Sequence, residues 1–234
     1  MPPLRAAHPQ RCQTALLHEP FIGDLYRLYH KPAGLQGHST MTKGFRHYQA
    51  LAEQLEKYVD PDRQEAILAG MDYVTSNSKP EVKVGWAREM MQRMESALDA
   101  KTCIKIREGC ACVLSNEKSI YARAFRRLRK LHPDDDEYVD EVVRYLNATT
   151  PLRRCGEVTR DGDRIYSVIA RGQCACPVLR AGLREPLSVT WCHCSKGSLL
   201  SVYRHVFPDR MCDMKIIRTI ASGAEDCCFV TTYR

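Results

Sequence analysis

Two pairs of closely spaced cysteines are the residues of this sequence best placed to do chemistry. Cys174 and Cys176 are separated by one residue, and so are Cys192 and Cys194. In an extended backbone, residues i and i+2 point to the same side, so each pair can present two thiols to one centre. Converging thiolates are ligands that Zn²⁺ and other thiophilic metals prefer. The sequence therefore predicts a metal site, with zinc or another thiophilic metal as its cofactor, made by these four cysteines.

The short spacing leaves other interpretations open. Structural zinc sites usually place about two to four residues between paired cysteines, and here there is one. A metal-free pocket of reactive thiols is one alternative. Simple burial is another, because free cysteine behaves as a small hydrophobic residue. For Cys110 we favour the core over a thiol that faces a ligand. Of the adjacent Cys227 and Cys228, one can face the core while the other lines a pocket.

The pattern of apolar residues in the first part of the chain predicts an array of helices. These helices must help to position the thiols. Apolar residues recur at three- and four-residue steps from Phe45 to Tyr58 and again from Trp86 to Leu98. Asp60-Pro61 is typical of a helix start, with Asp as the N-cap and Pro at the first helical position. Further helices are expected over residues 103–113, 115–131 and 133–146.

The character of the sequence changes near Thr149. A hairpin is expected across Asp161-Gly162-Asp163, then a strand at 187–191, a helix at 195–207 and a closing hairpin over 212–233. We predict an α+β fold in which an N-terminal helical array is followed by a small antiparallel sheet with one packed helix. The expected division is a poorly structured segment at 1–40, a helical region at 41–148 and a cysteine-rich domain at 149–234.

Composition excludes several classes of protein. The 234 residues are 44% hydrophobic and 27% charged, which is typical of a globular chain and not of a disordered one. No stretch approaches the roughly 18 apolar residues of a membrane helix, so we expect no membrane partner. The N-terminus has no apolar signal segment, which predicts a cytoplasmic protein. In that compartment the twelve cysteines are more often metal ligands or reactive thiols than disulfides.

Two features of the sequence could each serve a macromolecular partner, but each also has an explanation that needs no partner. The basic run Arg123–Lys130 contributes to the net charge of +7 and can meet phosphate groups. No nucleic-acid-binding signature accompanies it, so we favour a solvated helix face and expect no nucleic-acid partner. A nucleic-acid-associated protein stays as an alternative. The apolar stripe of Trp86, Met90, Met91 and Met94 is expected in the core, with a homodimer face as its alternative.

The last 80 residues resemble a group of small α+β domains. The motifs that carry the resemblance are a Cys-x-Cys-Pro loop at 174–177, Cys-x-Cys-Ser-x-Gly at 192–197 and a closing hairpin at 223–229. They are similar to 4-vinyl reductase-type domains and to L-2-amino-thiazoline-4-carboxylate hydrolase-like proteins. From about Trp86 onward the chain resembles uncharacterised cysteine-rich prokaryotic proteins. The closing hairpin departs from the pattern, because four residues and not three separate Gly223 from Cys228.

The resemblance implies the fold and two kinds of activity. The reductase-type domains imply a ligand sensor or accessory domain. The hydrolase-like proteins imply opening of a small sulfur- and nitrogen-containing ring. In that case Cys192 or Cys194 would be the nucleophile, because the N-terminus of a helix that starts at Ser195 lowers the pKa of a nearby thiol.

The leading hypothesis from the sequence is a cytoplasmic, thiolate-rich protein that binds a metal ion or a small molecule through its two Cys-x-Cys pairs. The alternative is a cysteine-dependent hydrolase that acts on a small sulfur- or nitrogen-containing substrate.

Overall fold

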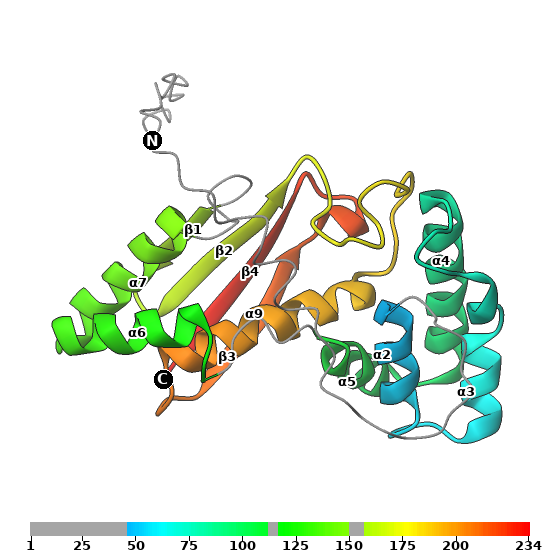
Figure 1. Ribbon diagram of the computed structural model, residues 1–234, viewed down its shortest axis with the longest axis horizontal. Coiled ribbons are helices and arrows are strands. Elements are labelled where there is room, and N and C mark those ends of the chain that lie inside the picture. The colour runs from blue at the N-terminus through cyan, green and yellow to red at the C-terminus, as the bar shows by residue number, and fades with distance from the viewer. Residues whose placement is uncertain (1–45, 112–116, 150–156) are drawn as a thin grey trace, which may run out of the picture. The chain divides into compact units, whose positions relative to one another are not determined.

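The computed structural model describes residues 46–111, 117–149 and 157–234, which form helices followed by an antiparallel sheet (Figure 1). The predicted α+β fold is confirmed. None of the described helices is both long and apolar enough to cross a bilayer. In chain order the elements are α2 (Arg46–Leu55), α3 (Pro61–Leu68), η1 (Met71–Tyr73), α4 (Pro80–Ala97), α5 (Ala100–Gly109), α6 (Ile120–Leu131), α7 (Asp135–Thr149), β1 (Glu157–Asp161), β2 (Arg164–Arg171), η2 (Val189–Cys192), α9 (His193–Val206), β3 (Cys212–Arg218), η3 (Ile220–Ser222) and β4 (Asp226–Tyr233).

The start of α3 is determined by two neighbouring residues, Asp60 and Pro61. Asp60 is the N-cap of α3, where its carboxylate accepts a hydrogen bond from the backbone N–H of Arg63 at 3.0 Å. Pro61 occupies the first helical position, which needs no N–H donor. The predicted start of this helix is confirmed.

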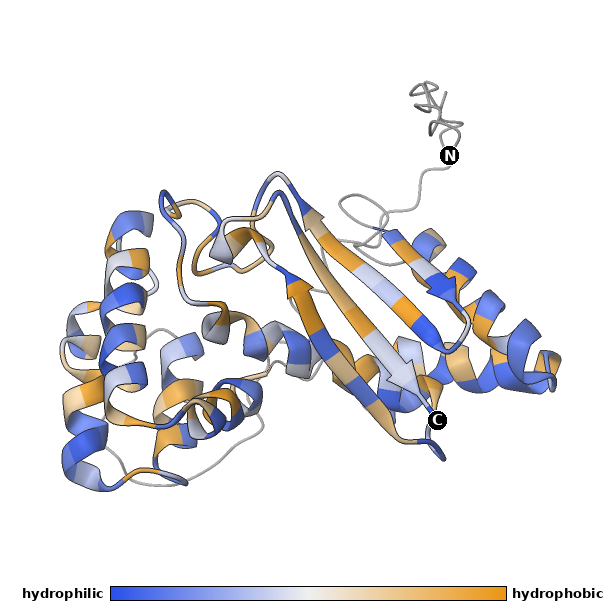
Figure 2. Cartoon of the chain, turned by 180° about the vertical axis from the view of Figure 1, so that it is seen from behind, coloured by the Kyte–Doolittle hydropathy of each residue, from blue (hydrophilic) through white to orange (hydrophobic). Residues whose placement is uncertain are grey.

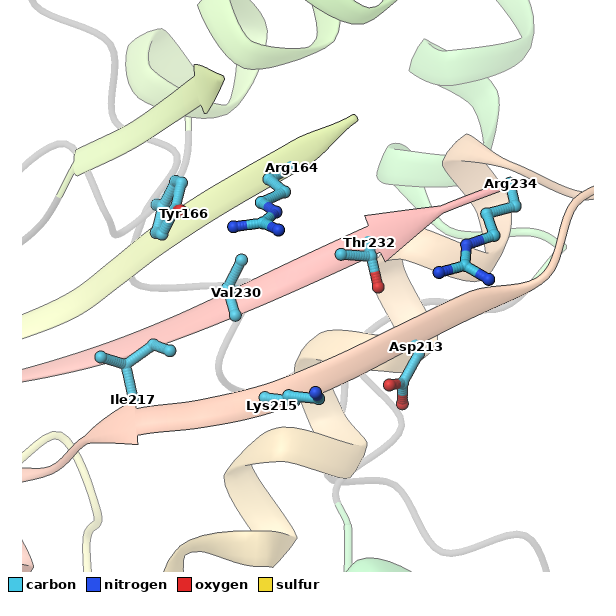
Figure 3. A pocket seen from close by; sticks show the side chains of 8 residues that line it. All are labelled: Arg164, Tyr166, Asp213, Lys215, Ile217, Val230, Thr232 and Arg234. Atoms are coloured by element: carbon cyan, nitrogen blue, oxygen red, sulfur yellow. The ribbon is translucent and has the colours of Figure 1, made fainter. Parts of the chain in front are cut away.

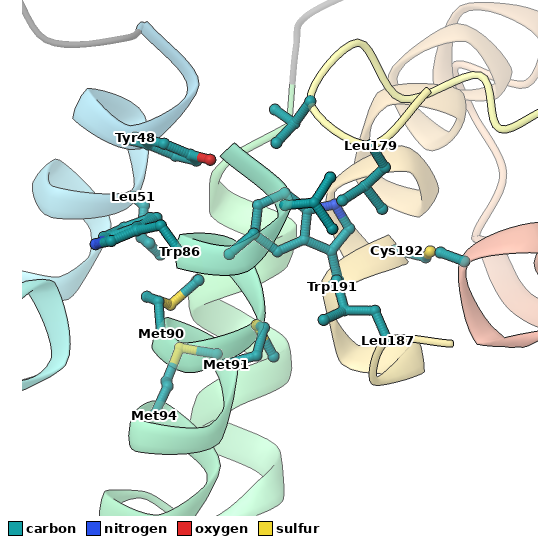
Figure 4. Close-up of a cluster of buried hydrophobic side chains, with 14 of the residues drawn as sticks. Tyr48, Leu51, Trp86, Met90, Met91, Met94, Leu179, Leu187, Trp191 and Cys192 are labelled. Carbon is teal, nitrogen blue, oxygen red and sulfur yellow. The ribbon is translucent and has the colours of Figure 1, made fainter. Parts of the chain in front are cut away.

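The apolar stripe of α4 lies in the core. Trp86, Met90, Met91 and Met94 are all buried, and Figure 4 shows them with Tyr48 on one side and Trp191 on the other. The rings of Tyr48 and Trp86 are 4.2 Å apart between centroids. Since the chain itself covers this stripe, its side chains are not exposed to form a dimer interface.

The sheet has four antiparallel strands in the order β1-β2-β4-β3. Both predicted hairpins are confirmed. The first turns at Gly162, whose φ of 56° favours glycine. Alternate side chains such as Ile165, Met214 and Phe229 lie in one core cluster with residues of α6, α7 and α9. Viewed from the opposite side, the sheet has no described helix in front of it (Figure 2).

The segment before α9 differs most from the secondary structure predicted for it. Residues 187–191 were expected as a strand, but they form a loop that continues into the 3₁₀ helix η2. The hydroxyl of Ser188 accepts a hydrogen bond from the N–H of Thr190 and starts this turn. The turn runs directly into α9, which begins at His193 and not at Ser195. Cys192 consequently has helical backbone angles, with φ −78° and ψ −4°.

Two core clusters connect the helices with the sheet region. The first contains Tyr48 and Met90 from the helical array together with Trp191 and Cys192. The second joins Phe125 of α6 to Phe229 of β4. Both clusters therefore span the boundary expected near residue 149, and α9 packs against α5 as well as β3.

Replacing Asp99 with alanine is expected to lower the free energy of unfolding at neutral pH. Asp99 is the N-cap of α5 and accepts hydrogen bonds from the Thr102 hydroxyl at 2.6 Å and the Thr102 N–H at 3.0 Å. These bonds, the hydroxyl's above all, hold the pKa of Asp99 below its usual range. A carboxyl with a lowered folded pKa stabilises the fold above its unfolded pKa and loses that contribution in acid.

Urea unfolding over a pH series checks this prediction. The difference between wild type and Asp99→Ala should be full at pH 7 and should shrink below about pH 4. Asp62→Ala is the control, because Asp62 lies in the first turn of α3 without being its N-cap. A difference that persists undiminished to about pH 2 would contradict the prediction.

Candidate functional site

Six cysteine side chains from separate parts of the chain gather beside α5 and α9. We call them the six-thiol cluster, and all six are free thiols. They come from the C-terminal end of α5, the loop after β2, the start of α9 and the start of β4. Its members are Cys110, Cys174, Cys176, Cys192, Cys194 and Cys227.

These thiols lie close enough to influence one another's ionisation. Burial is the main cause that raises the pKa of Cys176, and a charge on Cys194 would raise it further. The same Cys194 charge would raise the pKa of Cys110 and of Cys192. A charge on Cys176 would likewise oppose ionisation of Cys227. Cys194 is thus a central thiol of the cluster, with neighbours from α5, from the loop after β2 and from its own helix.

The cluster has a buried layer and a half-buried layer. Cys174, Cys192 and Cys227 are buried, whereas Cys110, Cys176 and Cys194 are half-buried. Burial raises the pKa of Cys174 and Cys192 to about 12 and that of Cys110 to about 11. These three thiols are therefore protonated at neutral pH.

The protonated state of the thiols decides which of the two predicted nucleophiles, Cys192 or Cys194, is the better candidate. A nucleophilic cysteine reacts as its thiolate, so a pKa of about 12 argues against Cys192 in that role. Its sulfur also contacts the Thr219 hydroxyl at 3.4 Å, on the side of the sheet and not of solvent. Cys194 lies in the first turn of α9 and is half-buried, so it is the more accessible of the two candidates.

The geometry expected for the second Cys-x-Cys pair is wrong. Cys192 and Cys194 were expected on extended backbone with their thiols on one side. Because Cys192 has helical backbone angles and Cys194 belongs to α9, the two side chains instead leave the helix on different sides, about 200° apart. Cys174 and Cys176, by contrast, lie in an irregular loop.

The described thiols lie near one another, but they do not form a metal-binding site with ligands in place. Within residues 46–111, 117–149 and 157–234, no three Cys, His, Asp or Glu side chains are arranged to hold one metal ion. Metal ligation by Cys174, Cys176, Cys192 and Cys194 therefore stays a prediction. Cys12, Cys112 and Cys155 lie outside the described residues.

A buried arginine forms one wall of the cluster. Arg107 of α5 is 3% exposed, and no carboxylate of the described residues forms an ion pair with it. Its Nη2 donates a hydrogen bond to the Trp191 carbonyl at 2.9 Å, and its guanidinium lies 4.1 Å from the centroid of the Trp191 ring. Its charge favours the thiolate of Cys110. A buried cation without a carboxylate is costly, so its neighbours must compensate it.

Two N–H donors in this wall have no hydrogen-bond partner of ordinary geometry among the described residues. They are Nε of Arg107 and the indole Nε1 of Trp191. The indole N–H nevertheless lies near enough to Cys176 to favour its thiolate. Unpaired buried donors are rare, because each loses its bonds to water. They favour negative charge on nearby sulfur, but burial is the stronger effect and keeps the pKa of Cys110 and Cys176 raised.

A polar group lies beside the cluster, where α5 meets α9. Glu108 Oε1 accepts a hydrogen bond from Lys196 Nζ at 2.7 Å and lies 3.2 Å from His193 Nδ1. Burial alone would raise the pKa of Glu108, but these two partners outweigh it and lower the pKa. Burial lowers the pKa of His193, which keeps this imidazole neutral at pH 7. The group ties the first turn of α9 to the last turn of α5.

Gly197 allows the two helices to approach closely at this point. A Cβ atom at Gly197 would lie 2.7 Å from the Ala111 Cβ and 2.8 Å from the Glu108 carbonyl oxygen. Cys110 follows directly on α5 as its C-cap. The glycine therefore brings the end of α5, with Cys110, next to Cys194.

Sequence reasoning gave two residues of this site an open role and missed a third. Cys110 was expected in the core, with a ligand-facing thiol left open because Gly109 directly before it can end the helix, and the structure packs Cys110 against the first core cluster. Of Cys227 and Cys228, one was expected in the core and the other at a pocket, and both are buried. Arg107 was missed, because an arginine in a helix is usually exposed.

The basic run on α6 is partly neutralised within the chain. Arg126 pairs with Glu117 at 2.9 Å, and Arg129 pairs with Asp135 at 2.7 Å. The guanidinium of Arg129 also lies 3.8 Å from the centroid of the Tyr138 ring. These contacts occupy two of the cations that a nucleic acid would need.

Comparison with known protein families gives a match over most of the chain. A family model with the description "Family of unknown function (DUF6144)" matches residues 43–233. No curated protein matches the chain. The match covers both the helical array and the sheet, and its description names neither of the two families that the cysteine motifs resemble.

Proposed function

The chain belongs to the DUF6144 family, whose function is unknown, and we propose that it binds a thiophilic metal ion in the six-thiol cluster. The proposed ligands are Cys174, Cys176, Cys192 and Cys194. The observation that carries the proposal is the gathering of free thiols from distant segments near Arg107, a buried cation with which no described carboxylate forms an ion pair. We also propose a cytoplasmic location, where thiols stay reduced.

The site of a small molecule is better sought away from the cluster. Binding sites for small molecules usually have volumes of about 300–1,000 Å³. Cavities of about 370 and 540 Å³ lie elsewhere in the described part of the chain, and no thiol of the cluster lines either of them. A metal ion needs no such cavity, because it replaces the protons of the thiols that bind it.

The charge of the wall also supports a metal–thiolate centre. A divalent ion with four thiolates carries a net charge of about −2. Arg107 would compensate part of this charge from its buried position. The unpaired N–H groups of Arg107 and Trp191 can donate to sulfur ligands, and such contacts orient and stabilise metal-bound thiolates.

Binding requires the ligands to close around the ion. Cys174 and Cys192 are protonated in the metal-free chain, so these two thiols must each lose a proton when they bind an ion. Deprotonation would have to be accompanied by a rearrangement of the first turn of α9, because Cys192 and Cys194 leave this turn on different sides. Cys192 must turn away from Thr219 in this step.

The second candidate, a cysteine-dependent hydrolase, has weaker support. The Glu108–His193 pair next to Cys194 supplies the types of residue that such an enzyme uses. However, successive residues on a helix point about 100° apart, which directs His193 away from the Cys194 sulfur. The metal proposal is therefore the one we develop.

Cobalt titration of the full chain, purified without a polyhistidine tag, tests the proposal. Tetrahedral Co²⁺ bound to thiolates gives strong charge-transfer absorption, so one equivalent should saturate such bands and protect about four thiols from alkylation. Cys194→Ser should weaken binding by more than 100-fold, which exceeds the roughly 10–100-fold cost of losing a second-shell partner. Arg107→Met should weaken binding by about 10-fold.

Cys212→Ser is the matched control, because Cys212 is a half-buried cysteine of β3 outside the cluster. It should bind Co²⁺ like wild type. Twelve thiols that all react in the presence of excess Co²⁺ or Zn²⁺ would overturn the proposal. So would charge-transfer bands that persist unchanged in Cys194→Ser.

A further inference from the structure

The face of the sheet opposite the helices carries a groove that the metal proposal does not involve. It has a volume of about 370 Å³ and is lined by residues of β2, β3 and β4 (Figure 3). This volume lies within the range of ligand sites. The groove is therefore large enough for a small molecule, and its side chains define which kind.

The pairing of the strands puts these side chains on one face. Tyr166 of β2 is opposite Val230 of β4, and Val230 is opposite Lys215 of β3. The next row contains Arg164, Thr232 and Asp213 in the same way. Side chains two residues apart on a strand share a face, so the two rows form one continuous surface.

The cations of the groove lack the partners that other arginines of the sheet have. Arg160, Arg171 and Arg218 each form an ion pair with a carboxylate. Among the residues that the structure describes, no carboxylate forms an ion pair with Lys215 or Arg234. Asp213 is the one carboxylate of the lining, against the three cations Arg164, Lys215 and Arg234. The groove is thus positively charged and open to an anion.

Arg164 is held at the edge of the groove. A hydrogen bond with Tyr166 is the main cause that raises its pKa, and Asp163 and Asp161 add to the effect. Figure 3 shows its guanidinium extending toward Val230. An arginine at this edge can form two parallel hydrogen bonds with a carboxylate.

The floor of the groove is apolar. Val230 lies on the interior strand β4 and is 8% exposed, with the Tyr166 ring on one side and Ile217 on β3 farther along. A flat apolar body can cover Val230 while an acidic group reaches the cations. Asp213 repels a second negative charge at the Thr232 end.

We propose that this groove binds a small aromatic carboxylic acid. The ring would lie over Val230 beside Tyr166, and the carboxylate would lie between Arg164 and Lys215. A single charge is favoured over a polyanion because Asp213 belongs to the same lining. The groove does not include any residue of the six-thiol cluster. Its proposed ligand binding is therefore independent of metal binding.

Benzoate and its neutral analogue benzamide are the probes that test the proposal. Titrated into ¹⁵N-labelled full chain, benzoate should shift the amide resonances of β2, β3 and β4 around the groove. Benzamide should bind about fivefold more weakly, as expected for loss of partly exposed ionic contacts. Lys215→Met should weaken benzoate binding by a similar factor.

Lys101→Met is the control, because Lys101 is an exposed lysine of α5 outside the groove. It should leave benzoate binding unchanged while lowering the net charge by the same amount. Equal affinity for benzoate and benzamide would overturn the proposal, as would no binding at millimolar concentration. Amide shifts confined to α6 would overturn it too.

Discussion

Replacing Gly197 with alanine is expected to destabilise the folded protein by about 1–3 kcal/mol, the usual cost of overpacking. In an isolated helix the same change would be favourable, because alanine is the better helix former. Here the new Cβ would lie 2.8 Å from the backbone oxygen of Glu108, which cannot rotate away as a side chain would. α5 and α9 must therefore move apart, and Cys110 moves with α5.

Gly85→Ala is the matched control for this prediction. Gly85 also lies inside a helix, α4, but a Cβ added there meets no atom within 4 Å. This change should stabilise the protein by about 0.5–1 kcal/mol. Urea unfolding of the two variants should therefore show midpoints that move in opposite directions. A Gly197→Ala variant as stable as wild type would mean that the contact between α5 and α9 is looser than described.

Replacing Trp191 with alanine is expected to cost about 3–5 kcal/mol of unfolding free energy, as for other large buried aromatic residues. Its side chain is 2% exposed and packs among Leu179, Leu187 and the helices of the array (Figure 4). It also covers the guanidinium of Arg107. Removing the ring leaves a cavity and takes away a favourable neighbour of a buried charge.

Far-ultraviolet circular dichroism should follow this unfolding, because the substitution removes one of the two tryptophans that would report by fluorescence. Tyr73→Ala is the control. Tyr73 is an aromatic residue of η1 that is 87% exposed, so its loss should change stability by less than about 0.5 kcal/mol. If Trp191→Ala costs less than about 1 kcal/mol, Trp191 does not hold this part of the core together.

The two hairpins could be predicted because their signals are local. The Asp-Gly-Asp turn fixes where the first pair reverses, and the alternating residues of 164–170 define its buried face. The start of α3 is equally local, since Asp60 and Pro61 act through neighbouring atoms. In each case the residues that determine the turn or the helix start lie within the same short stretch of sequence as the structure they determine.

The environment of the thiols could not be predicted because it depends on distant contacts. Residues 187–191 have strand propensity, yet none of the described strands pairs with them, and Trp191 is buried against the helical array instead. That placement decides the backbone of Cys192 and hence the direction of its thiol. Arg107 and Trp191 meet through the packing of α5 against η2, which no spacing in the sequence encodes.

The order of strands has a consequence for when the sheet can assemble during synthesis. β4, the last described element, lies between β2 and β3 and is the strand that both of them pair with. Until the ribosome has released the chain as far as Tyr233, β3 has no partner and β2 has only β1. Helices of the array can form earlier from local contacts, but the unpaired edges of β2 and β3 must wait, and unpaired edges are prone to aggregate. The nascent chain therefore depends on its final strand for protection.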